Sequence, residues 1–199
     1  MSSGDTGAEP VAVPEPDRPA LTSPGRVLIT GASGFVGRAV SAGFESAGHR
    51  VTGTSTSGTD STTALDLNRP EQIARVLETS WPTLIIHLAG IQSVRDAWED
   101  PEKTFRVNTG GTAALLREVE RQVPEAHFVL ASTAAVYGNP SGSQPFTEAD
   151  PLKPRSPYGA SKAAAEVLVL EAAARTGLPV TIARLFNQIG PDQPAGQVP

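Results

Sequence analysis

Residues 30–37 carry the stretch that decides the fold, Thr30-Gly31-Ala32-Ser33-Gly34-Phe35-Val36-Gly37. It joins a short apolar run at residues 27–29 to a segment, residues 34–47, whose apolar side chains recur at helical spacing. In such a loop one glycine permits a tight turn, one lets backbone approach a pyrophosphate, and one lets the helix pack closely. The spacing is G-x-x-G-x-x-G rather than the more familiar G-x-G-x-x-G. A plain turn is the alternative, but the position between strand and helix favours a dinucleotide-binding loop.

Strands and helices alternate along the rest of the chain. Further strands are expected at residues 50–54, 84–88, 128–131 and 180–186, and further helices at residues 70–79, 101–122 and 157–176. The run 84–88 is apolar throughout, as a strand covered on both faces should be. Such alternation predicts a parallel sheet with crossover helices on both faces. The predicted fold class is therefore α/β, a Rossmann-like doubly wound parallel sheet.

Length and composition divide the chain into one domain and two tails. A chain of 199 residues suits a single domain. Residues 1–25 are rich in proline and poor in bulky apolar groups, which predicts a disordered tail. Residues 26–193 form the expected NAD(P)-binding domain, and residues 194–199 are expected to be a tail or the truncated start of another domain.

Composition excludes several classes of function. The formal net charge is -5, from 16 basic and 21 acidic residues without a basic stripe, so no nucleic-acid partner is expected. The absence of cysteine excludes disulfides, zinc-thiolate sites and a cysteine nucleophile, and fits a cytoplasmic location. No apolar run approaches the roughly 20 residues of a membrane span, and the first 25 residues do not form a signal peptide. No metal site is predicted.

Tyr158 and Lys162 stand four residues apart on a predicted helix, and therefore on one face. A lysine stabilises tyrosinate, so it can lower the phenol pKa from about 10 toward the range useful for acid–base catalysis. Such a tyrosine can exchange a proton with a sugar hydroxyl while a nicotinamide exchanges a hydride with the same carbon. Because the chain has only two tyrosines and three lysines, a chance surface pair is disfavoured.

Hydroxyl groups follow the strand at residues 128–131, at the sheet edge where open α/β sheets bind ligands. By position alone, either Ser132 or Thr133 can orient a substrate oxygen, and a simple strand-end cap is the alternative. His87, near the end of a buried strand, is expected to be structural rather than a base.

Cofactor choice stays open between NAD and NADP. An acidic residue at the end of the second strand would select NAD, but residues 54–57 are all small hydroxyl residues. No arginine stands beside them to receive a 2′-phosphate, although Arg50 is near. Asp66, after a short linker, is placed to accept a hydrogen bond from the adenine amine, with an ordinary loop aspartate as the alternative.

Six motifs together resemble the extended short-chain dehydrogenase/reductase superfamily, in its NAD-dependent epimerase/dehydratase branch that acts on nucleotide sugars. The resemblance runs from Arg26 to about Gln193. The motifs are T-G-A-S-G-F-V-G (30–37), H-L-A-G (87–90), R-V-N-T-G-G-T (106–112), S-T-A-A-V-Y-G (132–138), S-P-Y-G-A-S-K (156–162) and A-R-L-F-N-Q-I-G-P (183–191).

The resemblance implies NAD or NADP as cofactor and assigns roles to individual residues. It places the catalytic hydroxyl on Thr133, the acid–base group on Tyr158, and on Lys162 the task of holding the tyrosine and the nicotinamide ribose. Asn187 would contact the nucleotide sugar together with Thr133 and Tyr158, and Asn108 would support the site. A homodimer through the helices that begin at Pro101 and Pro157 is a further implication. The implied cofactor-binding residues are Gly31, Ser33, Gly34, Phe35, Val36, Gly37, Asp66, Leu67, Leu88, Ala89, Gly90, Asn108, Tyr158 and Lys162.

Two departures from the family pattern narrow the expected activity. Nucleotide-sugar 4,6-dehydratases usually carry an acidic residue just after the catalytic threonine, whereas Ala134 and Ala135 cannot transfer a proton. This favours an epimerase or a 4-keto-sugar reductase, and residues 92–101 and 186–193 favour the GDP-mannose/GDP-6-deoxy-hexulose type. The second departure is length, because family members continue into a smaller substrate domain that is expected to be absent or truncated here. One alternative is a non-catalytic dinucleotide-binding protein, against which the Thr133, Tyr158 and Lys162 trio argues, and the other is an inactive truncated fragment of such an enzyme.

Overall fold

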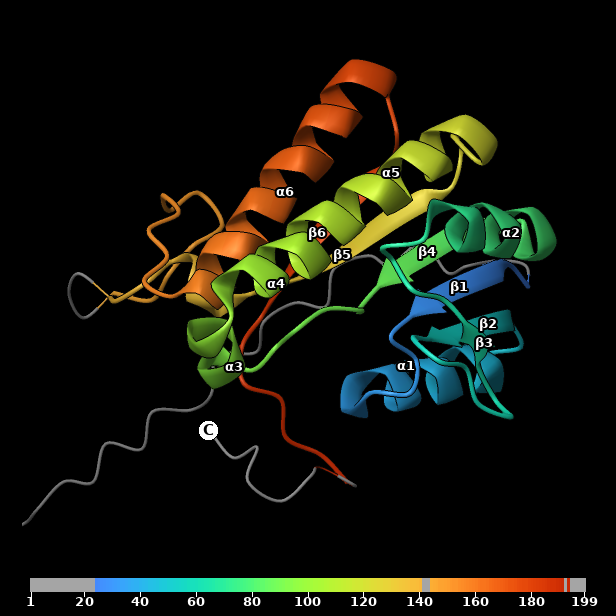
Figure 1. Cartoon of the computed structure of the whole chain (residues 1–199), viewed down its shortest axis with the longest axis horizontal. Helices are drawn as coiled ribbons and strands as arrows, with labels where there is room; N and C mark the ends of the chain where they lie inside the picture. The colour runs from blue at the N-terminus through green and yellow to red at the C-terminus, as the bar shows by residue number, and fades with distance from the viewer. Residues whose placement is uncertain (1–23, 141–143, 192, 194–199) are drawn as a thin grey trace, which may run out of the picture.

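A computed structural model describes residues 24–140, 144–191 and 193 and places the described strands in one sheet (Figure 1). The strand order is β3-β2-β1-β4-β5-β6, and every neighbouring pair is parallel. This is the order of doubly wound dinucleotide-binding sheets, in which the winding reverses between β1 and β4. The predicted fold class is confirmed. The strands are β1 (Arg26–Thr30), β2 (Arg50–Ser55), β3 (Thr63–Ala64), β4 (Leu84–His87), β5 (His127–Thr133) and β6 (Val180–Leu185).

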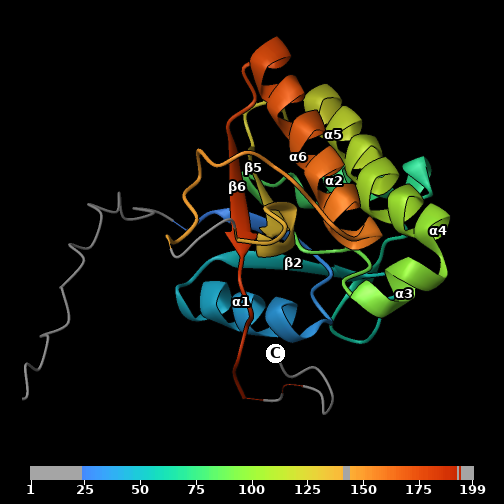
Figure 2. The same ribbon diagram turned by 90° about the vertical axis from the view of Figure 1, so that its left-hand side faces the viewer.

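Helices cover both faces of the sheet, with α1 on one side and α2, α5 and α6 on the other (Figure 2). Shorter helical segments connect β4 to α5 and follow β5. The α-helices are α1 (Phe35–Ser46), α2 (Pro70–Ser80), α3 (Val94–Glu99), α4 (Pro101–Phe105), α5 (Gly111–Gln122) and α6 (Pro157–Thr176). A π-helical turn spans Arg106–Gly110, and a 3-10 turn spans Ala134–Val136.

The two faces of the sheet are built by alternation along each strand. On β1, Leu28 points to the cluster formed with α2, α5 and α6, whereas Val27 and Ile29 point to the cluster beneath α1. Because strand side chains alternate between faces, an apolar run supplies both clusters at once. Burying each such side chain stabilises the fold by roughly 1.5–3 kcal/mol relative to leaving it exposed, so the central strands are held firmly in the core.

The structure differs from the sequence-based prediction in three elements. The single helix expected over residues 101–122 is divided into α4, the π-helical turn and α5. The π-helical turn contains Asn108, whose side chain bonds to neighbouring segments, and such turns are frequent at functional sites. Helix α3 and the two-residue strand β3 were not predicted, because both are too short to show a hydrophobic period.

The predicted tail at residues 1–25 falls almost wholly outside the described residues, as does the predicted segment 194–199. Gly25 belongs to the fold: its backbone N–H donates to His49 Nδ1 at 3.0 Å, and its carbonyl accepts from the Arg50 N–H at 3.0 Å. The domain therefore begins at least one residue earlier than residue 26.

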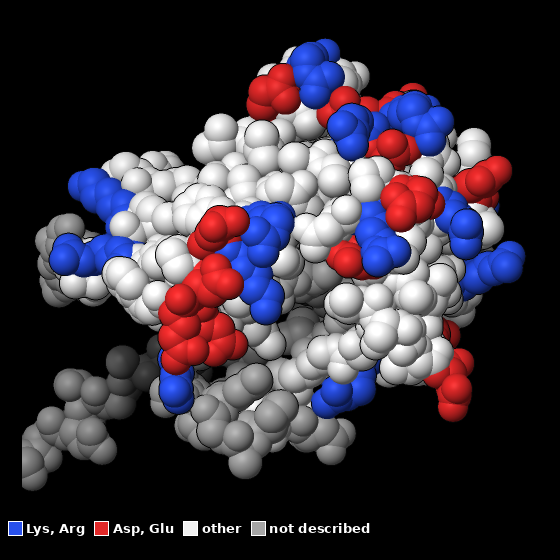
Figure 3. All heavy atoms as spheres, in the orientation of Figure 1, with Lys and Arg blue, Asp and Glu red and all other residues white. Residues whose placement is uncertain are grey.

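Charges of both signs are interspersed on the face shown in Figure 3. Several charged side chains of the described residues form ion pairs one helical turn apart, such as Arg95 with Glu99 and Arg106 with Glu102, both at 3.0 Å. Within the part of the chain that the structure describes, no helix is both long and apolar enough to cross a bilayer. The same residues contain no group of three or more His, Cys, Asp or Glu side chains that could hold a metal ion.

Candidate functional site

The glycine loop is packed so tightly that side chains are excluded at two of its glycines. Gly31 adopts a φ of 73°, and a Cβ there would lie 2.8 Å from the Ala89 backbone nitrogen. A Cβ at Gly37 would lie 2.2 Å from the Gly31 carbonyl oxygen. Helix α1 begins at Phe35, so the free N–H groups of its first turn face the end of the loop. This geometry fits the pyrophosphate of a dinucleotide.

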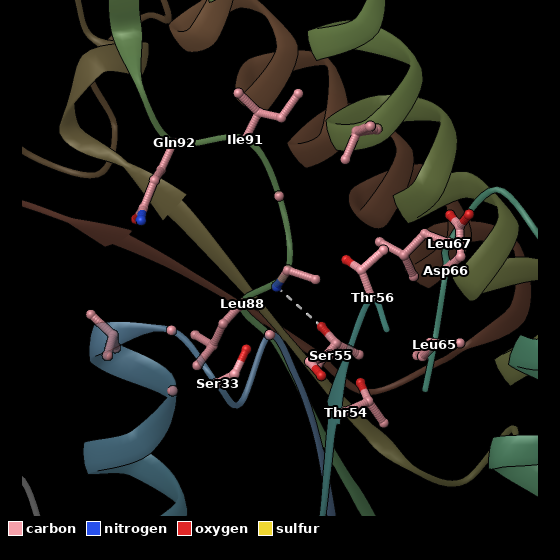
Figure 4. Close-up of a pocket in the computed structure, with 18 of the residues that line it drawn as sticks. Ser33, Thr54, Ser55, Thr56, Leu65, Asp66, Leu67, Leu88, Ile91 and Gln92 are labelled. Atoms are coloured by element: carbon pink, nitrogen blue, oxygen red, sulfur yellow. Dashed lines mark hydrogen bonds between the residues drawn. The ribbon is translucent and has the colours of Figure 1, made fainter. Parts of the chain in front are cut away.

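A cavity of about 460 Å³ opens at the carboxyl ends of β1, β2 and β4 (Figure 4). In Figure 4, Ser33 comes from the glycine loop, Leu88 from the end of β4, and Asp66 from the segment that follows β3. Ligands of doubly wound sheets bind at this edge, where the winding reverses. The cavity is lined by most of the predicted cofactor residues: Gly31, Ser33, Gly34, Phe35, Val36, Gly37, Asp66, Leu67, Leu88, Ala89 and Gly90.

One end of this cavity is lined by hydroxyl groups and one carboxylate. Thr54, Ser55 and Thr56 supply the hydroxyls, and Ser55 Oγ bonds to Thr62 Oγ1 at 2.8 Å. Asp66 Oδ1 accepts from the backbone and side-chain nitrogens of Asn68, both at 2.9 Å. These hydrogen bonds lower the pKa of Asp66, so its carboxylate is a charged acceptor at neutral pH.

A second cavity, of about 440 Å³, brings the predicted catalytic residues together. Thr133 enters it from the end of β5, Tyr158 and Lys162 from α6, and Asn187 from the segment after β6. The two cavities share lining residues and are therefore neighbours: Phe35, Val36, Leu88, Gly90, Ile91 and Gln92.

The start of α6 sets Tyr158 beside Thr133. Ser156 caps the helix by accepting a hydrogen bond from the Gly159 N–H at 3.1 Å, and Pro157 occupies the first turn, where its missing N–H costs nothing. A Cβ at Gly159 would lie 2.7 Å from the Ala135 carbonyl oxygen, so the helix packs directly on the segment after β5. The Tyr158–Lys162 pair is thus positioned by backbone contacts.

Burial dominates the electrostatics of Tyr158 and Lys162. It raises the pKa of Tyr158, although a hydrogen bond with Thr133 opposes the rise. It lowers the pKa of Lys162 to about 8, against the attraction of the Glu166 carboxylate. The sequence predicted that the lysine lowers the phenol pKa, and the net shift is opposite because desolvation of the phenolate is the larger effect.

Asn108 lies behind the cavities, nearly fully buried. Its side chain bonds to both backbone groups of Ile91, at 2.8 and 2.9 Å, and to Ser161 Oγ at 3.0 Å. These bonds fix the loop after β4 against α6, which agrees with a supporting role. A direct contact between Asn108 and the cofactor stays a prediction.

His87 is structural, as predicted. Its ring is 1% exposed, and its nitrogens bond to Thr30 Oγ1 at 2.7 Å and Thr112 Oγ1 at 3.1 Å. Burial, aided by the positive charge of Lys162, lowers the pKa of His87 to about 3. The imidazole is therefore neutral in the folded protein at neutral pH.

This buried imidazole predicts an acid-sensitive stability. Below its ordinary pKa of 6.5, His87 takes up a proton in the unfolded chain but not in the folded one. Its contribution is therefore complete above pH 6.5 and is lost as the pH falls toward 3. Between pH 7 and pH 5 the free energy of unfolding should drop by about 2 kcal/mol from this group. Urea unfolding at both pH values measures this pH dependence. It is carried out on wild type, on His87→Gln and on the exposed control His127→Gln. An equal pH dependence in all three proteins would contradict the assignment.

Two charged residues near the site were not predicted, the buried Glu166 and the partly buried Arg184. Glu166 Oε2 accepts from Arg184 Nη2 at 2.9 Å. One signal was available, because Glu166 interrupts an apolar stretch of α6 four residues after Lys162. The pairing with Arg184 on β6 depends on the tertiary fold and leaves no local pattern.

Comparison with known proteins places this geometry in a family. The model of the NAD dependent epimerase/dehydratase family matches residues 27–199. The GDP-6-deoxy-D-mannose reductase of Pseudomonas aeruginosa is 36% identical over 172 residues, which cover 84% of this chain and 54% of that protein.

Solved structures show the same likeness. The structure of RMD from Pseudomonas aeruginosa complexed with NADPH has a TM-score of 0.75 at 34% identity, covering 85% of this chain and 56% of that one. The UDP-glucose 4-epimerase of Thermus thermophilus in complex with NAD has a TM-score of 0.78 at 30% identity, covering 85% and 57%. The chain thus spans about half the length of these relatives. With its parallel sheet, its glycine loop and its Tyr158–Lys162 pair, the chain belongs to the NAD dependent epimerase/dehydratase family.

Proposed function

We propose that this protein is an NAD(P)-dependent enzyme of nucleotide-sugar metabolism, either an epimerase or a 4-keto-sugar reductase. One observation carries the proposal: Thr133, Tyr158, Lys162 and Asn187, from three separate parts of the chain, line one cavity. That cavity adjoins the glycine-loop cavity and shares residues with it. A protein that only sensed a dinucleotide would not need Thr133, Tyr158 and Lys162, the three proton-handling side chains among them.

The cofactor is NAD or NADP, which the solved relatives hold. The glycine loop and the start of α1 would bind the pyrophosphate, and Asp66 would accept a hydrogen bond from the adenine amine. Lys162 would bind the nicotinamide ribose. The end of β2 and the residue after it offer the hydroxyls of Thr54, Ser55 and Thr56, so no acidic side chain at this strand end selects against a 2′-phosphate.

The proposed reaction consists of a hydride transfer and a proton transfer. Held by the glycine loop and Lys162, a nicotinamide dinucleotide would supply or accept the hydride at the sugar carbon. In the reducing direction Tyr158 donates its phenolic proton to the carbonyl oxygen, which turns a keto group into a hydroxyl. Thr133 positions that oxygen, and Lys162 stabilises the resulting tyrosinate. The Tyr158 phenol is protonated at neutral pH, and burial raises its pKa further, so the site suits proton donation to a keto sugar.

Two observations narrow the range of candidate reactions and substrates. Ala134 and Ala135 line the second cavity at the positions where a dehydratase needs an acidic residue, so elimination is disfavoured. The GDP-6-deoxy-D-mannose reductase among the relatives supports a 4-keto sugar linked to GDP. A UDP-glucose 4-epimerase from Streptomyces lividans, 31% identical over 176 residues, keeps epimerisation as the second candidate.

A homodimer is part of the same proposal. Phe105 on α4 and Val167 and Leu170 on α6 are exposed, Val167 by 60%. A second copy of the chain would cover these apolar side chains. Light scattering after size exclusion should give twice the monomer mass, and Val167→Glu should shift it to the monomer mass. A wild-type monomer at micromolar concentration would contradict the dimer.

Turnover tests the proposal directly. The chain is incubated with NADPH or NADH and a GDP-linked 4-keto-6-deoxy sugar, and separately with NAD and UDP-glucose. Chromatography of the nucleotide sugars measures the conversion. We expect conversion in at least one mixture and its loss in Lys162→Met. If neither mixture reacts although a dinucleotide binds, the non-catalytic alternative is the better description.

A further inference from the structure

Glu166 carries a carboxylate with no exposed surface, one helical turn beyond Lys162 on α6. A buried carboxylate is costly unless its oxygens are paired. Here Oε1 accepts from Ser132 Oγ, and Arg184 donates through Nη2 at 2.9 Å to Oε2 and through Nε at 3.2 Å to both oxygens. The negative charge is therefore held in place inside the protein, on the face of α6 that carries Lys162.

The partners of Glu166 lie on the two strands that end at the second cavity. Ser132 on β5 and Arg184 on β6 are opposite each other in the parallel register. Arg184 also donates through Nη1 to the Tyr137 hydroxyl at 2.9 Å, and its guanidinium carbon lies 4.9 Å from the centroid of the Tyr137 ring. One carboxylate thus connects α6 to both strands. The next residue after Ser132 is Thr133, which lines the cavity.

Lys162 is faced by titratable or charged groups from three elements. Tyr158 and Glu166 lie on α6 itself, His87 reaches it from β4, and Arg184 approaches from β6 through its pairing with Glu166. His87 is neutral at neutral pH and Tyr158 is protonated, so neither offsets the charge of the ammonium group. Glu166 is the negative charge that opposes the effect of burial on Lys162.

We propose that Glu166 is a positioning residue of the catalytic site. Its buried carboxylate keeps Lys162 in the ammonium form. It also connects the ends of β5 and β6, where Thr133 and the segment with Asn187 lie, to the helix that carries Tyr158. The inference rests on the proposed function in one respect, namely that Lys162 serves Tyr158 in catalysis. Its electrostatic part concerns the chain alone and can be measured without turnover.

The direct test is the titration of Lys162 followed by NMR of the side-chain ε-carbons in the protein without ligands. The chain has three lysines, Lys103, Lys153 and Lys162, and the variants Lys103→Arg and Lys153→Arg assign the signals. Glu166→Gln keeps an acceptor oxygen for Ser132 and Arg184 but removes the charge. We expect the pKa of Lys162 to fall by about one unit or more relative to wild type. A Lys162 pKa unchanged from wild type in the folded variant would overturn the proposal.

Two further variants keep the test decisive. Glu171→Gln, on the same helix but exposed and paired with Arg175, should leave the Lys162 titration unchanged. If Glu166→Gln does not fold, the double variant Glu166→Gln/Arg184→Met removes both charges of the ion pair and should still lower the Lys162 pKa. Failure of both variants to fold would assign the ion pair to stability and count against the proposal.

Kinetics separate this inference from the proposed function. With a substrate that turns over, the alkaline limb of the kcat/KM profile should move to lower pH in Glu166→Gln by the amount measured for Lys162. A shifted Lys162 titration without wild-type turnover would contradict the proposed function and leave the coupling of Glu166 to Lys162 intact. A shifted titration with an unshifted kinetic profile would overturn the positioning role.

Discussion

Tyr158→Phe is expected to lower kcat by about 10²–10⁴-fold, the usual contribution of a positioned general acid or base. The substitution removes only the phenolic oxygen that exchanges the proton. The ring remains on α6 in the second cavity, and the glycine loop that would bind the pyrophosphate is unchanged. Cofactor affinity should therefore stay within about twofold of wild type. Steady-state turnover and fluorescence titration of the cofactor, measured on the same preparation, separate the two quantities.

The comparison between binding and turnover is the control for this variant. A parallel loss of cofactor affinity would show that the substitution disturbs the site as a whole. Turnover equal to that of wild type would remove Tyr158 from the mechanism, and Thr133 would then be the proton-handling group to examine.

Gly37→Ala is expected to abolish dinucleotide binding at concentrations where wild type is saturated. A Cβ at Gly37 would lie 2.2 Å from the Gly31 carbonyl oxygen and 2.8 Å from the Ala32 Cα, and these backbone atoms cannot give way without displacing the loop. Such overpacking typically costs about 1–3 kcal/mol of stability. Calorimetric titration measures the affinity, and urea unfolding measures the stability.

Gly43→Ala is the matched control on the same helix. A Cβ there meets no atom within 4 Å, and Gly43 lies inside α1. Because alanine has the higher helix propensity, this variant should be more stable than wild type by roughly 0.5–1 kcal/mol and should bind the dinucleotide normally. Equal losses of affinity in the Gly37 and Gly43 variants would contradict the role assigned to the loop.

The sheet and the glycine loop were predictable because their signals are local. An apolar run, a glycine loop and an amphipathic segment in immediate succession predicted β1, the turn and α1. The second cavity was predictable for a related reason. Parallel strands end at one edge of the sheet, so side chains just after β5 and at the start of α6 meet there whatever the details of the loops.

Features that depend on distant partners were not predictable. The π-helical turn is accompanied by contacts of Asn108 with Ile91 and Ser161, residues 17 and 53 positions away. Glu166 is paired with Ser132 and Arg184, at separations of 34 and 18 positions. No local sequence pattern indicates such pairs. The desolvation cost of burying these polar groups, and the hydrogen bonds that offset it, both arise only when the protein interior forms.

The direction of the Tyr158 pKa shift is the clearest case in which tertiary structure overrides a motif. The four-residue spacing to Lys162 predicted a lowered pKa, whereas burial raises it. Burial also lowers the pKa of Lys162 to about 8, which weakens the positive charge available to the phenolate at alkaline pH. The motif identifies the residues, and their burial determines their protonation states.

The proposed function requires the first cavity to be a dinucleotide site next to the Tyr158–Lys162 pair. Isothermal titration of the chain with NAD, NADH, NADP and NADPH tests it most directly. We expect that at least one of the four binds with a Kd well below the millimolar range and that Gly37→Ala abolishes this binding. Failure of all four to bind the wild-type chain below the millimolar range would contradict it.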